Sequence, residues 1–201
     1  MVCVNLKAQE LRKAQCMVHE NPVSRRIDMG RIVLNVREAG NGPLILFFHG
    51  ITSNSAVFVP MMARLWDRFT TIAVDQRGHG LSDKPESGYE ANDYADDIAQ
   101  LIQTLGRGPA ILVGHSLGSR NSVTAAARHP DLIRSVIAID FTPYIEDEVL
   151  DALESRVNAG DQLFNHAEAV VSYLSNRYPN VPASAIKIRA ESGYQPVPGG
   201  L

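Results

Sequence analysis

The sequence has no excess of positive charge, no long apolar run and no apolar segment near its start. Its 19 Lys and Arg residues are outnumbered by 22 Asp and Glu residues, which disfavours binding to nucleic acid or to an anionic membrane surface. No run approaches the roughly 18 apolar residues that a membrane-spanning helix needs. The first twenty residues contain no apolar core of a secretory signal. We therefore expect a cytoplasmic protein with neither nucleic acid nor membrane as a partner.

Cysteine is also scarce, because only Cys3 and Cys16 occur and both lie in the polar stretch over residues 1–22. Reduced thiols are typical of a cytosolic protein, and a disulfide between these two residues is the alternative. Neither cysteine stands at a metal-ligand spacing from a histidine or from the other cysteine. The sequence therefore predicts no metal site and no cofactor, and we interpret residues 1–22 as a polar leader.

What the sequence does contain is an alternation of strand and helix patterns over residues 23–142. Apolar or alternating runs predict strands, and apolar positions at spacings of three and four predict helices between them. The strands are predicted over 31–40, 44–48, 70–75, 110–116 and 133–140, and the helices over 56–66, 93–105 and 117–128. This alternation indicates an α/β fold with a mostly parallel sheet and helices on both faces. In such a sheet the ligand site lies beyond the carboxyl ends of the strands.

The pattern changes after Phe141, where helical segments follow and no further strand pattern returns. These helices are predicted over 145–158, 162–178 and 183–191, and the second ends before Pro179. Because this segment leaves the core from a strand end, we expect it to form a helical cap over the site. The predicted domains are a leader (1–22), an α/β core (23–142) and a cap (143–201).

The strongest chemical motif is Gly114-His115-Ser116-Leu117-Gly118, at the junction of a predicted strand and helix. This is the G-x-S-x-G pattern, in which the glycines let the helix pass close to the strand and the serine occupies a sharp turn. The turn exposes the hydroxyl, so Ser116 is predicted to be a nucleophile. The alternative is a tight strand–helix turn that carries a serine by coincidence.

A serine nucleophile needs N–H donors for the oxyanion that develops during acyl transfer. The backbone N–H of Leu117 is adjacent to the nucleophile and is one predicted donor. The N–H of Ile51 is the other, because the loop "HGITSN" at 49–54 follows an earlier predicted strand. Together these two groups predict an oxyanion hole, and an ordinary turn at 49–54 is the alternative.

A nucleophilic serine also needs an acid and a base. Asp140 ends the next predicted strand between apolar neighbours, so its carboxylate is expected to require a partner. It is the predicted acid, and an aspartate that caps the next segment is the alternative. Histidines occur at positions 19, 49, 79, 115, 129 and 166. None follows a later strand, and we interpret His49 and His115 as structural residues of turns. His166, in the predicted cap, is kept as an alternative, but we expect the base to lie outside this chain.

Taken together, these motifs resemble the α/β-hydrolase fold family. The resemblance rests on "HGITSN", "DQRGHGLSD", "GHSLGS" and "SRNSVTAAARHP", and it extends from about residue 24 to the end. It implies the chain order serine, acid, histidine, with the histidine after the last strand. It also implies that the last two strands, the terminal helix and the catalytic histidine are missing, so that the chain is a fragment. An inactive remnant or a non-catalytic binding protein is the alternative.

Within that family, the acid after the sixth strand in "AIDFTP" resembles a small group of amidohydrolases that act on unsaturated dicarboxylates. The resemblance implies metal-free hydrolysis of an amide on a small-molecule dicarboxylate, in bacterial breakdown of vitamin B6 or nicotinate. Serine as the nucleophile disfavours the dehalogenase and epoxide-hydrolase branches, which use aspartate. The resemblance leaves open whether the amide carries an acetyl or a formyl group, and whether the substrate is another ester or amide. It also leaves open whether the protein is a homodimer.

The same resemblance implies that three arginines bind the substrate carboxylates, namely Arg156, Arg177 and Arg189. One arginine lies in each predicted cap helix. A guanidinium that faces a cleft holds a carboxylate through two parallel hydrogen bonds. Judged by their spacing alone, the three would be solvated surface residues, and this is the alternative.

Overall fold

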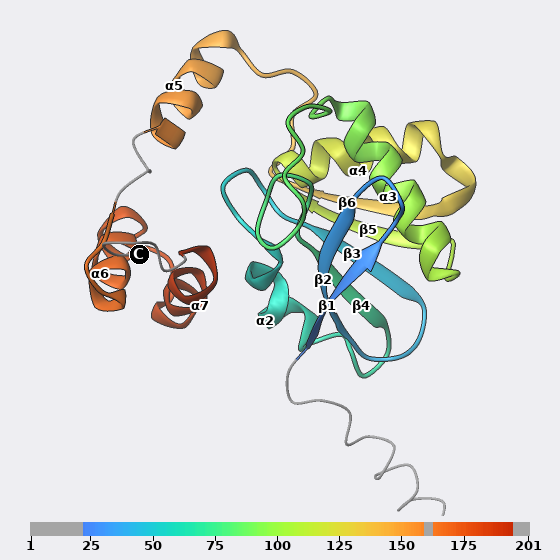
Figure 1. The fold of residues 1–201 in the computed structure, drawn as a ribbon, viewed down its shortest axis with the longest axis horizontal. Helices are drawn as coiled ribbons and strands as arrows, with labels where there is room; N and C mark the ends of the chain where they lie inside the picture. The colour runs from blue at the N-terminus through green and yellow to red at the C-terminus, as the bar shows by residue number, and fades with distance from the viewer. Residues whose placement is uncertain (1–21, 159–162, 195–201) are drawn as a thin grey trace, which may run out of the picture.

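The computed structural model describes residues 22–158 and 163–194, which form a six-stranded sheet and its helices (Figure 1). The strands are β1 (Val23–Asp28), β2 (Val33–Ala39), β3 (Leu44–Phe48), β4 (Thr70–Val74), β5 (Ala110–His115) and β6 (Ile133–Ile139). Their order in the sheet is β1-β2-β4-β3-β5-β6. The β1–β2 and β2–β4 pairs are antiparallel, whereas every pair from β4 to β6 is parallel. This topology confirms the predicted mostly parallel sheet.

Parallel pairing brings the carboxyl ends of four strands to one edge of the sheet. Phe48 at the end of β3 is in register with Val74 of β4 and Gly114 of β5. The end of β5 is in turn in register with the end of β6. The residues that follow these strands therefore share one edge, and they are His49, Asp75, Ser116 and Asp140.

The structure contains one strand that the sequence did not predict. β1 pairs with β2 at the edge of the sheet, and only Ile27 of its six residues is buried. An edge strand with a single buried side chain has no apolar alternation that would reveal it. Residues 1–21, which carry nearly all of the predicted leader with Cys3, Cys16 and His19, lie outside the described residues.

Helices α3 (Ala91–Leu105) and α4 (Leu117–Arg128) lie within two residues of their predicted bounds. The predicted helix over 56–66 is shorter, because it divides into η1 (Ser55–Phe58) and α2 (Val59–Met62). After Met62 the backbone hydrogen bonds close turns, such as that from the Leu65 N–H to the Met62 carbonyl, and no regular helix continues. A short turn, η2 (Pro130–Leu132), connects α4 to β6.

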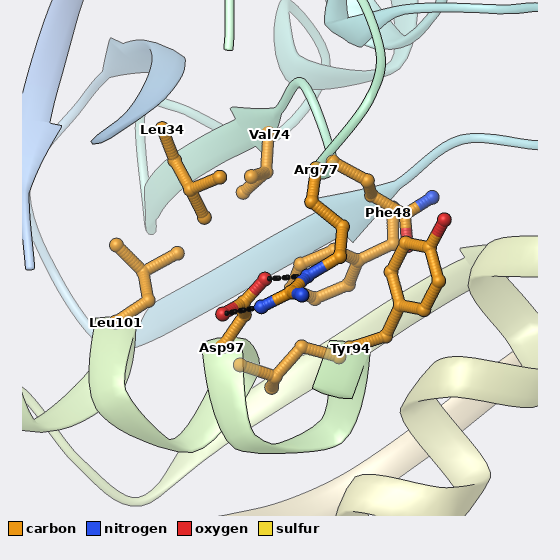
Figure 2. Close-up of a pocket in the computed structure, with 9 residues that line it drawn as sticks. Leu34, Phe48, Val74, Arg77, Tyr94, Asp97 and Leu101 are labelled. Atoms are coloured by element: carbon orange, nitrogen blue, oxygen red, sulfur yellow. Dashed lines mark hydrogen bonds and ion pairs between the residues drawn. The ribbon is translucent and has the colours of Figure 1, made fainter. Parts of the chain in front are cut away.

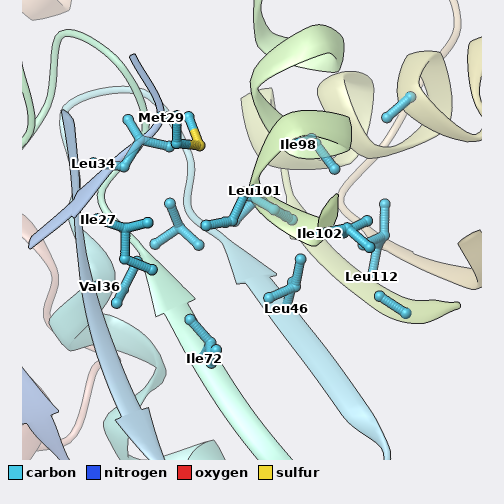
Figure 3. Close-up of a cluster of buried hydrophobic side chains, with 14 of the residues drawn as sticks. Ile27, Met29, Leu34, Val36, Leu46, Ile72, Ile98, Leu101, Ile102 and Leu112 are labelled. Atoms are coloured by element: carbon cyan, nitrogen blue, oxygen red, sulfur yellow. The ribbon is translucent and has the colours of Figure 1, made fainter. Parts of the chain in front are cut away.

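Apolar side chains cover both faces of the sheet. On one face, Leu101 of α3 belongs to a cluster with Leu46 and Leu112 of the central strands (Figure 3). On the other face, Met62 of α2 belongs to a second cluster with Phe47. Burial on both faces explains the near-continuous apolar runs of β3, β4 and β5. The predicted helices on both faces are therefore confirmed.

Three helices follow β6, namely α5 (Asp147–Asn158), α6 (Ala167–Arg177) and α7 (Ala183–Gly193). The prediction of a helix over 162–178 is wrong at its start. The His166 side chain accepts the Ala169 N–H and caps α6 at that point. α6 and α7 pack on each other through Leu174 and Ile186, and α7 also contacts η1. In Figure 1 the three helices form an arc beside the sheet, with α7 next to the segment that contains α2.

Candidate active site

The turn between β5 and α4 holds Ser116 in a strained backbone conformation. Its φ is 50° and its ψ is −111°, a combination that residues other than glycine rarely adopt. The Ser116 N–H donates to the Ile139 carbonyl at 2.9 Å, while the Ser116 carbonyl accepts from two N–H groups of α4. The side chain is half-buried. Among the side chains and backbone groups that the structure describes, none hydrogen-bonds to its hydroxyl.

Gly114 and Gly118 let α4 approach the sheet closely enough to form this turn. A Cβ on Gly114 would overlap the Gly118 carbonyl, and a Cβ on Gly118 would overlap the Phe48 carbonyl of β3. The Gly118 N–H also donates to the His49 carbonyl at 3.1 Å. Backbone contact therefore requires both glycines, as the G-x-S-x-G pattern predicts.

The loop after β3 passes directly beside Ser116. A Cβ built on Gly50 would lie 3.4 Å from the Ser116 Cβ. Ile51 follows, and Thr52 then adopts a positive φ of 57°. In the part of the chain that the structure describes, neither the Ile51 N–H nor the Leu117 N–H has an acceptor. Both predicted oxyanion donors are thus carried by segments that meet at the serine.

His49 supports this loop from below. Its Nδ1 lies 2.8 Å from the Gly50 carbonyl, and its Nε2 accepts the Gln76 N–H at 3.1 Å. Because Nε2 is an acceptor, Nδ1 carries the proton and the ring is neutral. Burial lowers the pKa of His49 to about 4. With both nitrogens engaged, His49 is a structural residue and not a base for Ser116.

A second set of hydrogen bonds connects the loop to α4. The Gln76 side chain donates to the His49 carbonyl at 2.6 Å and accepts from the Asn121 side chain at 2.7 Å. All three residues are buried. Neither Gln76 nor Asn121 could be selected from the sequence, because a lone amide carries no motif and its burial is a tertiary property.

Asp75 connects the same loop to the rest of the sheet edge. Its carboxylate accepts from the Ser55 N–H at 2.6 Å, the Leu81 N–H at 3.0 Å and the Asn35 side chain at 2.9 Å. Burial alone would raise the pKa of Asp75, but these donors outweigh burial and lower it below its ordinary value. Its place at a strand end was visible in the sequence, whereas its role as an acceptor for three segments was not.

Asp140 lies next to Ser116 but is not buried. It follows Ile139, whose carbonyl binds the Ser116 N–H, and it has a positive φ of 54°. Its side chain is 82% exposed, and its Oδ2 lies 3.9 Å from the His115 Nε2. The carboxylate is exposed although its neighbours are apolar, since Phe141 is itself exposed, and the expectation that it requires a partner stays a prediction. The carboxylate is open to a further partner.

The remaining described histidines are engaged away from the serine hydroxyl. The rings of His79 and His49 meet edge to face with centroids 5.0 Å apart. His129 contacts a carboxylate of α3 at 3.1 Å, and His166 caps α6. None of them hydrogen-bonds to Ser116 within residues 22–158 and 163–194. The expectation that the base lies outside the chain therefore stays a prediction.

Two of the three predicted substrate arginines converge on one tyrosine. The Arg177 and Arg189 guanidinium carbons lie 5.9 Å and 4.8 Å from the centre of the Tyr178 ring. Arg177 also donates to the Tyr173 hydroxyl at 2.7 Å, and its hydrogen bond with Tyr178 raises its pKa. Both arginines are half-buried, whereas the side chain of Arg156 in α5 lies outside what the structure describes. α6 and α7 therefore present two cations close together.

A small cavity lies elsewhere, between the sheet and α3 (Figure 2). Beside it, the Arg77 guanidinium makes two hydrogen bonds of 2.6 Å with the Asp97 carboxylate, and its carbon lies 5.8 Å from the centre of the Tyr94 ring. A volume of about 10 Å³ has room for about one water. This cavity is a packing feature around a buried ion pair and is separate from Ser116.

Within the described ranges, no helix is both long and apolar enough to cross a membrane. The same residues contain no group of three or more His, Cys, Asp or Glu side chains that could hold a metal ion.

Residues 43–180 match the protein family described as alpha/beta hydrolase fold. A 2-(acetamidomethylene)succinate hydrolase from Mesorhizobium japonicum is 79% identical over 179 residues, which are 89% of this chain and 64% of the relative. The crystal structure of E-2-(acetamidomethylene)succinate hydrolase has a TM-score of 0.86 at 79% identity, over 89% of this chain and 67% of that chain. A fluoroacetate dehalogenase from a Burkholderia species is 32% identical, over 66% of this chain and 45% of the relative. The chain thus spans 64% of the length of the first of these relatives.

Proposed function

Because this chain belongs to the α/β-hydrolase fold family, we propose that it forms part of a serine amidohydrolase in which Ser116 is the nucleophile. The observation that carries the proposal is the strained turn at Ser116, which lies against the loop that bears Ile51. Strain of this kind costs on the order of 1–3 kcal/mol, and it persists where the surrounding structure over-determines the conformation. A serine that only closed a turn would not need it.

The proposed substrate is 2-(acetamidomethylene)succinate, an amide of an unsaturated dicarboxylate. Support comes from the 79% identity to an enzyme of that name and from the convergence of Arg177 and Arg189 on Tyr178. Each guanidinium can hold one carboxylate through two hydrogen bonds, so a dicarboxylate would engage both. Arg156 is the proposed third member of this set.

In the proposed reaction, the Ser116 Oγ attacks the acetyl carbonyl carbon and its proton passes to a histidine outside these residues. Asp140 orients that histidine, and the N–H groups of Ile51 and Leu117 stabilise the oxyanion. Collapse of the tetrahedral intermediate breaks the C–N bond, and the histidine returns the proton to the leaving nitrogen. Water then releases acetate from the serine. As the resemblance implies, a second water then hydrolyses the departing enamine, which releases ammonia, and loss of carbon dioxide from the resulting aldehyde leaves succinic semialdehyde.

Replacement of Ser116 in the whole protein tests the nucleophile. Ser116→Ala should lower kcat for the dicarboxylate amide by several orders of magnitude, up to about 10⁶-fold for a triad nucleophile. Ser122→Ala is the matched control. Ser122 is buried in α4, the helix that begins directly after Ser116, and its hydroxyl has no hydrogen-bond partner among the described residues. It should leave kcat nearly unchanged. A loss of less than about tenfold in Ser116→Ala would remove Ser116 from the reaction.

The wild-type protein tests the substrate class in the same assay. It should hydrolyse the acetyl amide of the dicarboxylate faster than a neutral acetate ester that cannot engage the arginines. Faster turnover of the corresponding formyl amide would change the assigned acyl group and leave the mechanism in place. Absence of turnover on every amide and ester would favour a non-catalytic protein.

A further inference from the structure

Asn54 stands at the end of the loop that carries Ile51, and its side chain is almost fully buried. Its backbone is extended, and its Oδ1 accepts the Ala56 N–H at 3.0 Å. This is the geometry of a helix N-cap, in which a side-chain oxygen satisfies an N–H group that has no partner in the helix. Asn54 thereby begins η1 and ends the loop over residues 49–54, which carries Ile51 and which we call the oxyanion loop.

The other end of the same amide reaches across to α7. The Asn54 Nδ2 donates to the Ser192 carbonyl at 2.9 Å, over a separation of 138 residues. The last four carbonyls of a helix have no partner within it, and Ser192 lies in the last turn of α7. Among the described residues, this is the one hydrogen bond between α7 and the segment from β1 to β6. One amide therefore caps the start of η1 and the end of α7 together.

Each capped end lies close in sequence to one part of the proposed site, namely the oxyanion donor Ile51 or the carboxylate-binding Arg189. Ile51 lies three residues before Asn54, and Arg189 lies three residues, or nearly one helical turn, before Ser192. Contact between α7 and η1 places these elements side by side, as Figure 1 shows. A shift of α7 relative to this loop would move Arg189 relative to the oxyanion donor.

We propose that Asn54 is a positioning residue that holds α7 on the oxyanion loop, so that a substrate carboxylate at Arg189 sets the distance of the scissile carbonyl from Ile51. The inference rests on the proposed function of the site. Positioning of this kind converts binding energy at a remote group into orientation at the reacting bond.

Asn54→Asp separates the two roles of the side chain. A carboxylate is a good N-cap and keeps the bond from Ala56, but it cannot donate to Ser192 and puts negative charge at the negative end of α7. Asn54→Ser also keeps a cap and is too short to reach α7, so an effect shared by both variants reports the lost donor. Asn92→Asp, an exposed position in α3, is the matched control for the chemical change.

Hydrogen exchange of the 201-residue chain measures the attachment of α7 directly. In both Asn54 variants, amides of residues 183–193 should exchange about tenfold faster than in wild type or Asn92→Asp, the scale of one lost hydrogen bond. Amides of β3 and β5 should exchange as in wild type. Unchanged exchange in α7 would overturn the proposal, because α7 would then be held without Asn54.

Kinetics of the whole protein measure the consequence for the site. kcat/KM for the dicarboxylate amide should fall about tenfold in both variants, while kcat/KM for a neutral acetate ester stays at the wild-type value. An equal loss on both substrates would mean that Asn54 only folds the loop, and would overturn the positioning role. If wild type does not hydrolyse the amide, the proposed function fails, and exchange in α7 alone then upholds or overturns the attachment by Asn54.

Discussion

At the residue scale, backbone strain is concentrated on one edge of the sheet. Thr52, Ser116 and Asp140 are the residues other than glycine that have a positive φ in the described chain. They follow β3, β5 and β6, whose carboxyl ends lie side by side. Each such conformation is unfavourable by itself and must be offset by the packing around it. The segments proposed to supply the oxyanion donor, the nucleophile and the acid therefore coincide with the strained ones.

The neutral His49 beneath this edge should make stability depend on pH. Its pKa is about 4 in the folded chain, against an ordinary value of 6.5. Between these values the unfolded chain binds more protons than the folded chain, so the free energy of unfolding falls as the pH drops from 6.5 toward 4. The stability that the neutral His49 gives the fold is fully present above pH 6.5. The difference between the two pKa values corresponds to about 3 kcal/mol in the free energy of unfolding. Urea unfolding at a series of pH values measures this decrease.

A variant identifies the group responsible for the slope. His49→Asn retains a donor for the Gly50 carbonyl and removes the titrating ring, so it should flatten the pH dependence between 6.5 and 4. It should also lower stability at neutral pH, because the Gln76 N–H loses its acceptor. The lowered pKa of Asp75 makes stability depend on pH only below its ordinary value of 3.8, which is outside the range from pH 6.5 to 4. A slope that His49→Asn leaves unchanged would assign the effect to another group.

At the scale of elements, the site depends on the close approach of α4 to β3. Gly118 lies against the backbone carbonyl of Phe48, where neither partner is a flexible side chain that could move aside. Gly118→Ala should therefore displace the Ser116 turn and destabilise the fold by about 2–3 kcal/mol. Gly193→Ala is the matched control, because an added Cβ in α7 meets nothing within 4 Å. Thermal unfolding checks both variants, and equal Tm values would contradict the close contact.

Elements with a local signal could be predicted from the sequence. β3 matches its predicted bounds because a continuous apolar run is buried on both faces, and α4 matches because the glycine-flanked turn marks where it begins. β1 could not be predicted, because Ile27 is its only buried residue. The predicted helix over 56–66 was too long, because its apolar spacing continues past Met62 where the backbone turns.

The residues of the candidate site likewise divide into those with a local signal in the sequence and those without one. Ser116, Ile51 and Asp140 could be placed because parallel strands end at one edge, and each residue follows such a strand. The bond from Asn54 to Ser192 could not be predicted, because nothing local distinguishes a buried amide from an exposed one. The exposure of Asp140 is likewise a tertiary property, set by what packs over the end of β6.

At the scale of the whole molecule, the two edges of the sheet differ in character. β1 forms one edge, and its arginines pair with Glu38 and Asp83, which makes this edge a poor template for another strand. Among the described residues, β6 forms the other edge and pairs only with β5. Ile137 in β6 is 54% exposed. An edge strand that is rich in β-branched residues and has little charge favours pairing with a strand of another chain.

We therefore expect the 201-residue chain to self-associate through β6, and Ile137→Lys to shift it toward the monomer. Sedimentation velocity over a range of concentrations measures this shift. Val149→Lys is the matched control, because it adds the same charge at an exposed apolar position of α5 and should leave association unchanged. Equal effects of the two variants would assign the change to net charge and contradict edge pairing. A strand paired at β6 would lie beside Asp140, so self-association and access of a catalytic histidine to that carboxylate should compete for one edge.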